Sequence, residues 1–168
     1  MRELFHFPNP VNEVSARLVA GAVVVMSLVV LVFDQNWILV PLAYGFVARV
    51  LTGPTLSPLG QVVTRVVTPA LPFRAKPIAG PPKRFSQGIG AAMSLTALVL
   101  DFAFGLTTAA HVVVGLIAVA ATLESVFAFC IGCKMFAGLM RLGLVPDDVC
   151  EACNNIWDRP GAAAGQRA

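Results

Sequence analysis

Residues 15–33 read SARLVAGAVVVMSLVVLVF, an apolar run whose single charge, Arg17, lies near its start. A run of this length can cross the hydrocarbon core of a bilayer as one helix. Arg17 is placed so that its side chain can extend back to the lipid headgroups. The polar lead-in is long, no clear cleavage site follows, and a second apolar run comes almost at once, all of which argues against a cleaved signal peptide. We therefore expect a transmembrane helix here.

The composition of the whole chain favours the same class of protein. Of 168 residues, 57% are hydrophobic and only 12% are charged, and the mean hydropathy is +0.80. Soluble globular proteins carry about 25% charged residues. A chain this poor in charge cannot cover a soluble surface with polar groups, so we expect an integral membrane protein.

Three further apolar runs follow, at residues 37–51, about 85–105 and about 107–129. The second run is short, and we expect it to form a tight hairpin with the first. The last two are rich in Gly, Ala, Ser and Thr, which let helices approach closely inside lipid. The sequence therefore predicts an all-α fold, an integral membrane four-helix bundle built from one hairpin at 15–52 and a second at 85–129.

The segments outside these hairpins differ in composition. Residues 53–84 hold seven of the twelve prolines, which excludes one long helix. Within them, valines at helical spacing predict a short amphipathic helix on the membrane surface, with a packed loop as the alternative: Val62, Val63, Val66 and Val67. We expect residues 1–14 to form a polar N-terminal segment, residues 130–159 a helical tail, and residues 160–168 to be disordered.

Positive charge lies on one side of this four-helix arrangement. Lys and Arg collect in loops that stay in the cytoplasm. The turns near Asn36 and Leu106 carry neither residue type, whereas the central segment and the chain after the fourth run carry many: Arg49, Arg65, Arg74, Lys76, Lys83, Arg84, Lys134, Arg141, Arg159 and Arg167. We therefore expect both termini, the central loop and the tail on the cytoplasmic side of the cell membrane.

Four ionisable residues lie in or near the apolar runs, namely Arg49, Asp101, His111 and Glu124. Such groups are costly against lipid, so they are expected to face the bundle interior. Asp101 and His111 flank the turn near Leu106 at equal distances, which predicts a His–carboxylate pair near the outer face. Glu124 and Arg49 lie at similar depth near the inner face, which predicts an ion pair. Structural pinning of the bundle is the main interpretation, with proton relay and extension to the interface as alternatives.

All four cysteines fall into two Cys-x-x-Cys pairs, Cys130/Cys133 and Cys150/Cys153, separated by sixteen residues. This spacing fits a zinc site, in which four thiolates would close a tetrahedral, structural metal shell. The second pair follows Pro146-Asp147-Asp148, a typical helix start, and would share one helix face. Unreactive packing cysteines are a third interpretation.

Redox chemistry is the competing hypothesis. If a helix begins near Ile131, its N-terminus and Lys134 would favour the thiolate of Cys130, whereas a fourth span that continued through Cys130 would remove that effect. Cys130 would then attack a disulfide, Cys133 would resolve the mixed disulfide, and Cys150 and Cys153 would accept the electrons.

Several short motifs together resemble a bacterial family known as domain of unknown function 4395. They are Asn9-Pro10-Val11-Asn12, the 49–58 stretch with Gly53-Pro54 and Ser57-Pro58, Phe129-Cys130-Ile131-Gly132-Cys133-Lys134, and Cys150-Glu151-Ala152-Cys153. The resemblance covers residues 9–157 and implies a multi-helix membrane protein of the bacterial inner membrane with no established activity. It also implies thioredoxin-like or sulfurtransferase proteins as partners, and it assigns no role to any residue.

The sequence therefore predicts thiol–disulfide or sulfur-transfer chemistry at the inner face of the membrane, with no cofactor. The alternative is a structural zinc site on a membrane scaffold or assembly protein. The central loop is basic and Pro-rich, with only Phe73 and Phe85 as aromatics, so membrane lipid is expected as a partner and nucleic acid is not.

Overall fold

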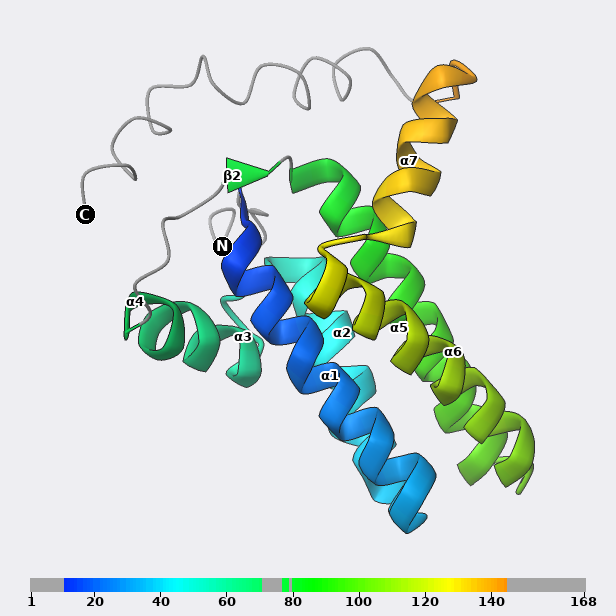
Figure 1. Cartoon of the computed structure of the whole chain (residues 1–168). Coiled ribbons are helices and arrows are strands. Elements are labelled where there is room, and N and C mark those ends of the chain that lie inside the picture. The colour runs from blue at the N-terminus through cyan, green and yellow to red at the C-terminus, as the bar shows by residue number, and fades with distance from the viewer. Residues whose placement is uncertain (1–10, 71–76, 79, 145–168) are drawn as a thin grey trace.

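The computed structural model describes residues 11–70, 77–78 and 80–144, and these are almost entirely helical (Figure 1). Two-residue strands β1 (Val11–Asn12) and β2 (Pro77–Ile78) pair antiparallel, a small addition to the predicted all-α fold. The helices are α1 (Glu13–Phe33), the 3₁₀ turn η1 (Asn36–Ile38), α2 (Leu39–Thr52), α3 (Pro58–Val62), the π turn η2 (Val63–Val67), α4 (Thr68–Ala70), α5 (Gly80–Phe102), α6 (Thr107–Phe127) and α7 (Ile131–Arg141).

Local sequence explains where several of these helices begin. The Asn12 side chain accepts a hydrogen bond from the N–H of Val14 at 3.0 Å, which caps α1. Ser57 caps α3 in the same way, with Pro58 in the first turn. Helix α5 begins five residues before the predicted start at Phe85, because Pro81 and Pro82 fit the first turn of a helix, where no backbone donor is needed.

The four long helices pack in the order α1, α6, α5, α2. The expectation that α2 would pack tightly on α1 was wrong, since these two make few contacts and α2 packs on α5 instead. Gly90 explains this choice of neighbour. A Cβ at Gly90 would lie 2.3 Å from the ring of Phe46, so only glycine lets α2 approach so closely.

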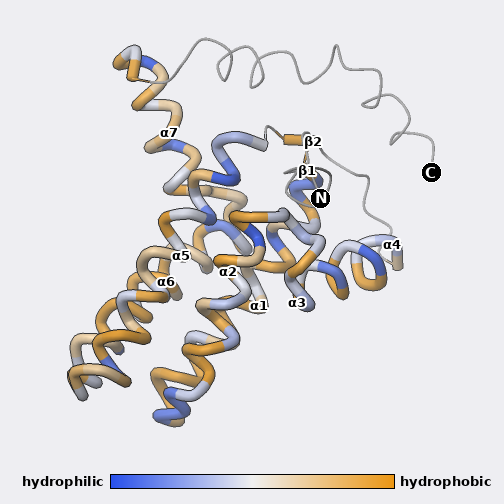
Figure 2. The backbone as a smooth tube through the Cα atoms, turned by 180° about the vertical axis from the view of Figure 1, so that it is seen from behind, coloured by the Kyte–Doolittle hydropathy of each residue, from blue (hydrophilic) through white to orange (hydrophobic). Residues whose placement is uncertain are grey.

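The outward faces of the long helices are apolar. Three helices, α1, α5 and α6, are long and apolar enough to cross a membrane, and no more than 28% of the most apolar window of each is buried inside the protein. Exposed side chains include Val25, Val112 and Val119, and Figure 2 shows apolar residues along the length of the helices. An apolar surface of this extent is typical of contact with lipid.

The second predicted span, α2, is shorter than the other three long helices. With the preceding turn it covers Asn36–Thr52, an apolar helix below the length of the other spans. It nevertheless runs antiparallel to α1 and α5. Asn36, in the turn that precedes α2, donates a hydrogen bond to Asp101 at one end of the bundle. Near the C-terminus of α2, the carbonyl of Val50 accepts a hydrogen bond from Arg84 at the other end.

The central segment contains the predicted helix rather than a packed loop. Residues 58–70 form α3, η2 and α4 in succession, beside the N-terminal half of α1 (Figure 1). The valines do not form one face, however. Val63 is buried, whereas Val62 and Val66 are exposed next to the exposed Arg65. The π turn changes the helical period, which separates residues that a regular helix would align.

Helix α7 leaves the bundle at a sharp angle and touches it through its first turns (Figure 1). Its contact is with the start of α5, where the rings of Phe85 and Phe136 lie 5.5 Å apart. Gly132 makes the approach possible, because a Cβ there would lie 2.7 Å from the Cα and Cβ of Ser86. The position of the Cys130–Cys133 segment therefore depends on a glycine.

We predict that Gly132→Ala detaches the start of α7 and lowers the thermal unfolding temperature of the detergent-solubilised protein. Overpacking of this kind lowers the free energy of unfolding by about 1–3 kcal/mol. The matched control is Gly138→Ala in the same helix, where a Cβ would meet nothing within 4 Å. That change should stabilise slightly, because alanine is the better helix former. Equal thermal unfolding temperatures for the two variants would contradict the proposed close packing.

Candidate functional site: the Cys130–Cys133 turn

The chain breaks between α6 and α7, directly before the first cysteine pair. Ala128 adopts a left-handed conformation, with φ of 55°, and ends α6. Arg17 of α1 stabilises this end. Its guanidinium donates to the carbonyl oxygens of Ser125 at 3.0 Å and Val126 at 2.9 Å, which the helix leaves without internal partners. The fourth span is therefore interrupted before Cys130 and ends two residues before the predicted Phe129.

Cys130 occupies the N-cap of α7, so the hypothesis of a helix beginning near Ile131 is confirmed. The backbone N–H of Cys133 donates to the sulfur of Cys130 at 3.4 Å. A helix N-terminus carries a partial positive charge and free N–H groups, both of which stabilise an anion. The helix start thus favours the thiolate form of Cys130.

Ser86 of α5 completes the surroundings of the Cys130 sulfur, with its hydroxyl oxygen 3.2 Å from that atom. The pKa of Cys130 is lowered to about 5, chiefly by the hydrogen bond from the Cys133 thiol. The Ser86 hydroxyl, the charge of Lys83 and the Cys133 backbone N–H act in the same direction, while burial opposes them. The pKa of Cys133 is raised, because its thiol donates to Cys130 and is itself buried.

The two thiols therefore have different roles available to them. The thiolate, which is the reactive form of a cysteine, is favoured at Cys130 and disfavoured at Cys133. The hydrogen bond from the Cys133 thiol to Cys130 favours the protonated form of Cys133. Both cysteines are free and half-buried, so each sulfur is partly accessible from outside the protein.

The thiols line a hollow of about 410 Å³ that we term the thiol pocket. Charged side chains surround it from four helices: Glu13 and Arg17 from α1, Lys83 from α5, Glu124 from α6 and Lys134 from α7. Lys134 also lies 5.9 Å from the ring centre of Phe129. Five charged side chains in the lining, three positive and two negative, suit contact with a polar group or with the polar surface of another protein.

Lys83 and Glu124 form an ion pair in the lining of the thiol pocket. Their side chains are 5% and 14% exposed. The predicted pairing of Glu124 with Arg49 is therefore wrong. Lys83 takes the place of Arg49, because the early start of α5 brings residue 83 inside the bundle, opposite the end of α6.

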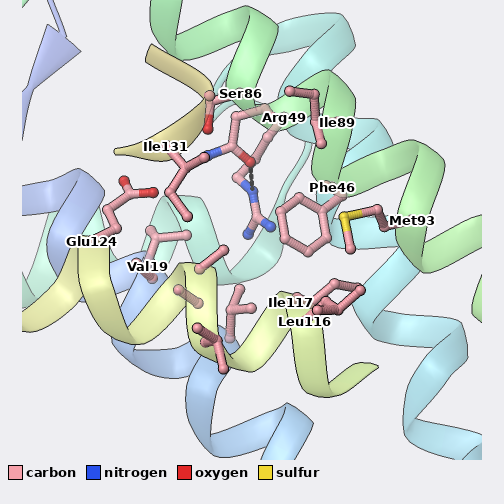
Figure 3. A pocket seen from close by; sticks show the side chains of 18 of the residues that line it. Val19, Phe46, Arg49, Ser86, Ile89, Met93, Leu116, Ile117, Glu124 and Ile131 are labelled. Atoms are coloured by element: carbon pink, nitrogen blue, oxygen red, sulfur yellow. Dashed lines mark hydrogen bonds between the residues drawn. The ribbon is translucent and has the colours of Figure 1, made fainter. Parts of the chain in front are cut away.

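Arg49 instead lies among uncharged partners. Its Nε donates to the Gln87 side chain at 3.1 Å, and its guanidinium carbon lies 4.7 Å from the ring centre of Phe46. Figure 3 shows Arg49 pointing into a second cavity, with Glu124 at the far side of that cavity.

The remaining two predicted residues meet at the opposite end of the bundle, but not as a direct pair. The Asn36 side chain donates to Asp101 at 3.0 Å and lies 3.1 Å from Nε2 of His111. A carboxylate oxygen of Asp34 lies 3.8 Å from Nε2 of His111, and Asp101 also accepts from Thr107 at 2.9 Å. Asn36 thus joins the two hairpins, in place of the predicted His111–Asp101 contact.

Cys150 and Cys153 lie outside the described residues, so the relay pair and the four-cysteine zinc site both stay predictions. Within residues 11–70, 77–78 and 80–144, no group of three His, Cys, Asp or Glu side chains is placed to hold a metal. The first pair alone supplies two of the four ligands that a structural zinc needs.

Sequence reasoning missed three residues of the site, namely Arg17 as a cap, Ser86 as a sulfur partner and Lys83 as the partner of Glu124. The one available signal was charge at the edge of an apolar run, which Arg17 and Lys83 share. Ser86 carries no such signal, since a serine among small residues also fits close helix packing.

Comparison with known proteins identifies the family. The family model described as "Domain of unknown function (DUF4395)" matches residues 11–141. The chain belongs to the DUF4395 family. No curated protein and no solved structure matches it. The matched range in this DUF4395 protein includes Cys130 and Cys133 and ends before Cys150, so the first pair lies within the family domain.

We predict that Cys130 of this DUF4395 protein is alkylated at a rate that is half-maximal near pH 5 and constant through neutral pH, since the thiolate predominates above its pKa. A free cysteine would reach half-maximum at about pH 8.5. The measurement is the rate of iodoacetamide modification of Cys130, followed by mass spectrometry, after replacement of Cys150 and Cys153 by serine.

Ser86→Ala removes a hydrogen-bond donor to the thiolate and should move this midpoint upward by about 1 pH unit. Ser94→Ala is the matched control, because Ser94 is a buried serine of the same helix whose hydroxyl donates to the carbonyl of Ala91. An unshifted midpoint in Ser86→Ala, or an equal shift in both variants, would rule out the role given to Ser86.

Proposed function

We propose that this protein carries out thiol–disulfide exchange at the cytoplasmic face of a cell membrane, with Cys130 as the nucleophile and Cys133 as the resolving thiol. The observation that supports this most directly is the position of Cys130 at the N-cap of α7, beside Ser86 and within a pocket that holds Lys83. A cysteine with a lowered pKa in a partly exposed, positively charged setting is typical of a reactive thiol.

The reaction balances with the groups of this chain and one disulfide-bearing partner. The Cys130 thiolate attacks one sulfur of the partner disulfide, which forms a mixed disulfide and expels the other sulfur as a thiolate. Loss of the Cys130 charge removes the acceptor whose hydrogen bond held the proton on Cys133. Cys133 then gives up its proton to water and attacks the Cys130 sulfur. The products are a Cys130–Cys133 disulfide and a partner reduced by two electrons to two thiols.

Sulfur transfer would begin with the same atom. In that variant the Cys130 thiolate takes the outer sulfur of a persulfide, and the donor leaves as a thiolate. A thioredoxin-like or sulfurtransferase protein is the class of partner proposed for either reaction. The charged rim of the thiol pocket, including the exposed Lys134, suits the surface of such a protein.

The orientation proposed here places the thiols in the reducing compartment. The end of the bundle where α7 emerges carries five basic residues: Arg17, Arg49, Lys83, Arg84 and Lys134. The opposite end carries Asp34 and Asp101. Arginine and lysine are retained on the cytoplasmic side. Four crossings, with α2 as the short span, would leave both termini on that side.

We expect the Cys150→Ser/Cys153→Ser protein to show a reversible two-electron couple between Cys130 and Cys133. The measurement is the mass of the protein, with thiols trapped, after equilibration in glutathione buffers of graded potential. Oxidation should remove two hydrogen atoms, and the additional change Cys133→Ser should abolish this transition. A protein that stays reduced at every potential, or a wild-type protein that retains zinc after purification without chelator, would exclude the exchange proposal.

Topology can be tested separately with a membrane-impermeant maleimide applied to intact cells. A protein with Cys130 as its single cysteine should react only after the cells are permeabilised. A cysteine-free protein carrying Leu106→Cys, at the exposed turn between α5 and α6, should react without permeabilisation. The reverse labelling pattern would place the thiols outside and remove the compartment on which the proposal depends.

A further inference from the structure

A second cavity, separate from the thiol pocket, lies inside the bundle, and we term it the lateral cavity. It has a volume of about 350 Å³ and is enclosed by α1, α2, α5, α6 and the start of α7 (Figure 3). Neither described cysteine lines it. Ser86, Gly132 and Glu124 lie along the boundary with the cysteine turn, so the cavity is a neighbour of the thiol site and not part of it.

The lining of the lateral cavity is mostly apolar. Met93 and Ile89 of α5 and Leu116, Val119 and Ala120 of α6 contribute to it. Leu116 is 56% exposed and Val119 is 60% exposed, so this side of the cavity opens on the surface that faces lipid. A volume of this size is at the lower end of small-molecule sites, which are largely apolar with a few polar groups. The opening therefore admits an apolar molecule from the bilayer.

The polar group in the depth of the cavity is Arg49, whose guanidinium points into the space beside Phe46 (Figure 3). Arg49 is only 6% exposed. Its Nε donates to Gln87, which is neutral, and within the described part of the chain no carboxylate pairs with it. Glu124, the acidic residue on the same cavity, is paired with Lys83.

An uncompensated buried charge is costly in a medium of low dielectric constant, and such charges are normally paired. Inside a membrane protein, ionisable groups facing a cavity commonly mark a ligand or ion site. An anion placed on the free guanidinium nitrogens would supply the missing countercharge.

We propose that the lateral cavity binds a single-chain amphiphile with a carboxylate head, a long-chain carboxylate from the bilayer, with the head on Arg49 and the chain along α5 and α6. A guanidinium pairs with a carboxylate through two parallel hydrogen bonds. One cation and a narrow apolar space fit one chain with one negative charge better than a two-chain phospholipid. This site does not depend on the proposed thiol chemistry.

The test uses dodecanoate and dodecanol, which share a chain and differ in head-group charge. The measurement is displacement of a fluorescent fatty acid from the full-length protein in detergent. Wild type should bind dodecanoate more tightly than dodecanol. Arg49→Gln should lower the affinity for dodecanoate at least ~10-fold, as expected for loss of hydrogen bonds to a charged group. The same change should leave the affinity for dodecanol unchanged. Arg65→Gln, on the exposed surface of η2, is the control and should match wild type.

Two further variants keep the outcome decisive if Arg49→Gln is poorly folded. Arg49→Lys preserves the charge and should retain most of the preference for dodecanoate. Ala120→Phe narrows the cavity without changing Arg49 and should lower the affinity for both ligands. Ala109→Phe, at an exposed position of the same helix, should change neither affinity. Equal affinity of wild type for dodecanoate and dodecanol would overturn the proposal. Tighter, Arg49-dependent binding of a single-chain phosphate lipid would overturn the choice of a carboxylate.

Discussion

The arrangement of the cysteine site depends on the interruption of the helix between Phe127 and Ile131. If α6 continued, the sulfur of Cys130 would lie on a helix flank with no free N–H groups near it. The left-handed Ala128 ends the helix, and Arg17 binds the carbonyl oxygens that the ending exposes. A new helix begins three residues later with Cys130 as its cap. The helix ending and the thiolate environment are thus two results of one turn.

Close packing at two glycines places this turn against the bundle. Gly132 brings the first turn of α7 onto Ser86, and Gly90 brings α2 onto α5 through Phe46. Helix α5 is therefore the common support of the cysteine turn, the Lys83–Glu124 pair and the Arg49–Gln87 contact. Lipid provides no hydrophobic force between helices, so close backbone approach and internal polar contacts have to hold them together. Asn36 makes the corresponding contact at the other end of the bundle.

The thiol pocket and the lateral cavity differ in the charge of their linings and are both lined by Glu124. The thiol pocket is surrounded by cations and anions from four helices, whereas the lateral cavity is apolar around a single guanidinium. Glu124 borders both and is neutralised by Lys83. Because an unpaired carboxylate there would offset the charge of Arg49, the Lys83–Glu124 pair also preserves the positive potential of the lateral cavity. The proposed thiol exchange and the proposed amphiphile site can therefore occupy separate cavities although they are close in the structure.

The sequence by itself determined the apolar helices, their approximate limits, the helical character of the central segment and the inward position of the ionisable residues. These follow from composition and short-range patterns, which depend on neighbours along the chain. It also allowed a helix start at Ile131 without requiring it. The partners were decided only by the tertiary structure: Glu124 bonds Lys83 and not Arg49, and Asn36 stands between Asp101 and His111. The depth of a residue along a span can be counted from the sequence. The rotation of each helix and the helix it packs against depend on tertiary contacts such as Gly90 with Phe46, which the sequence pattern does not reveal.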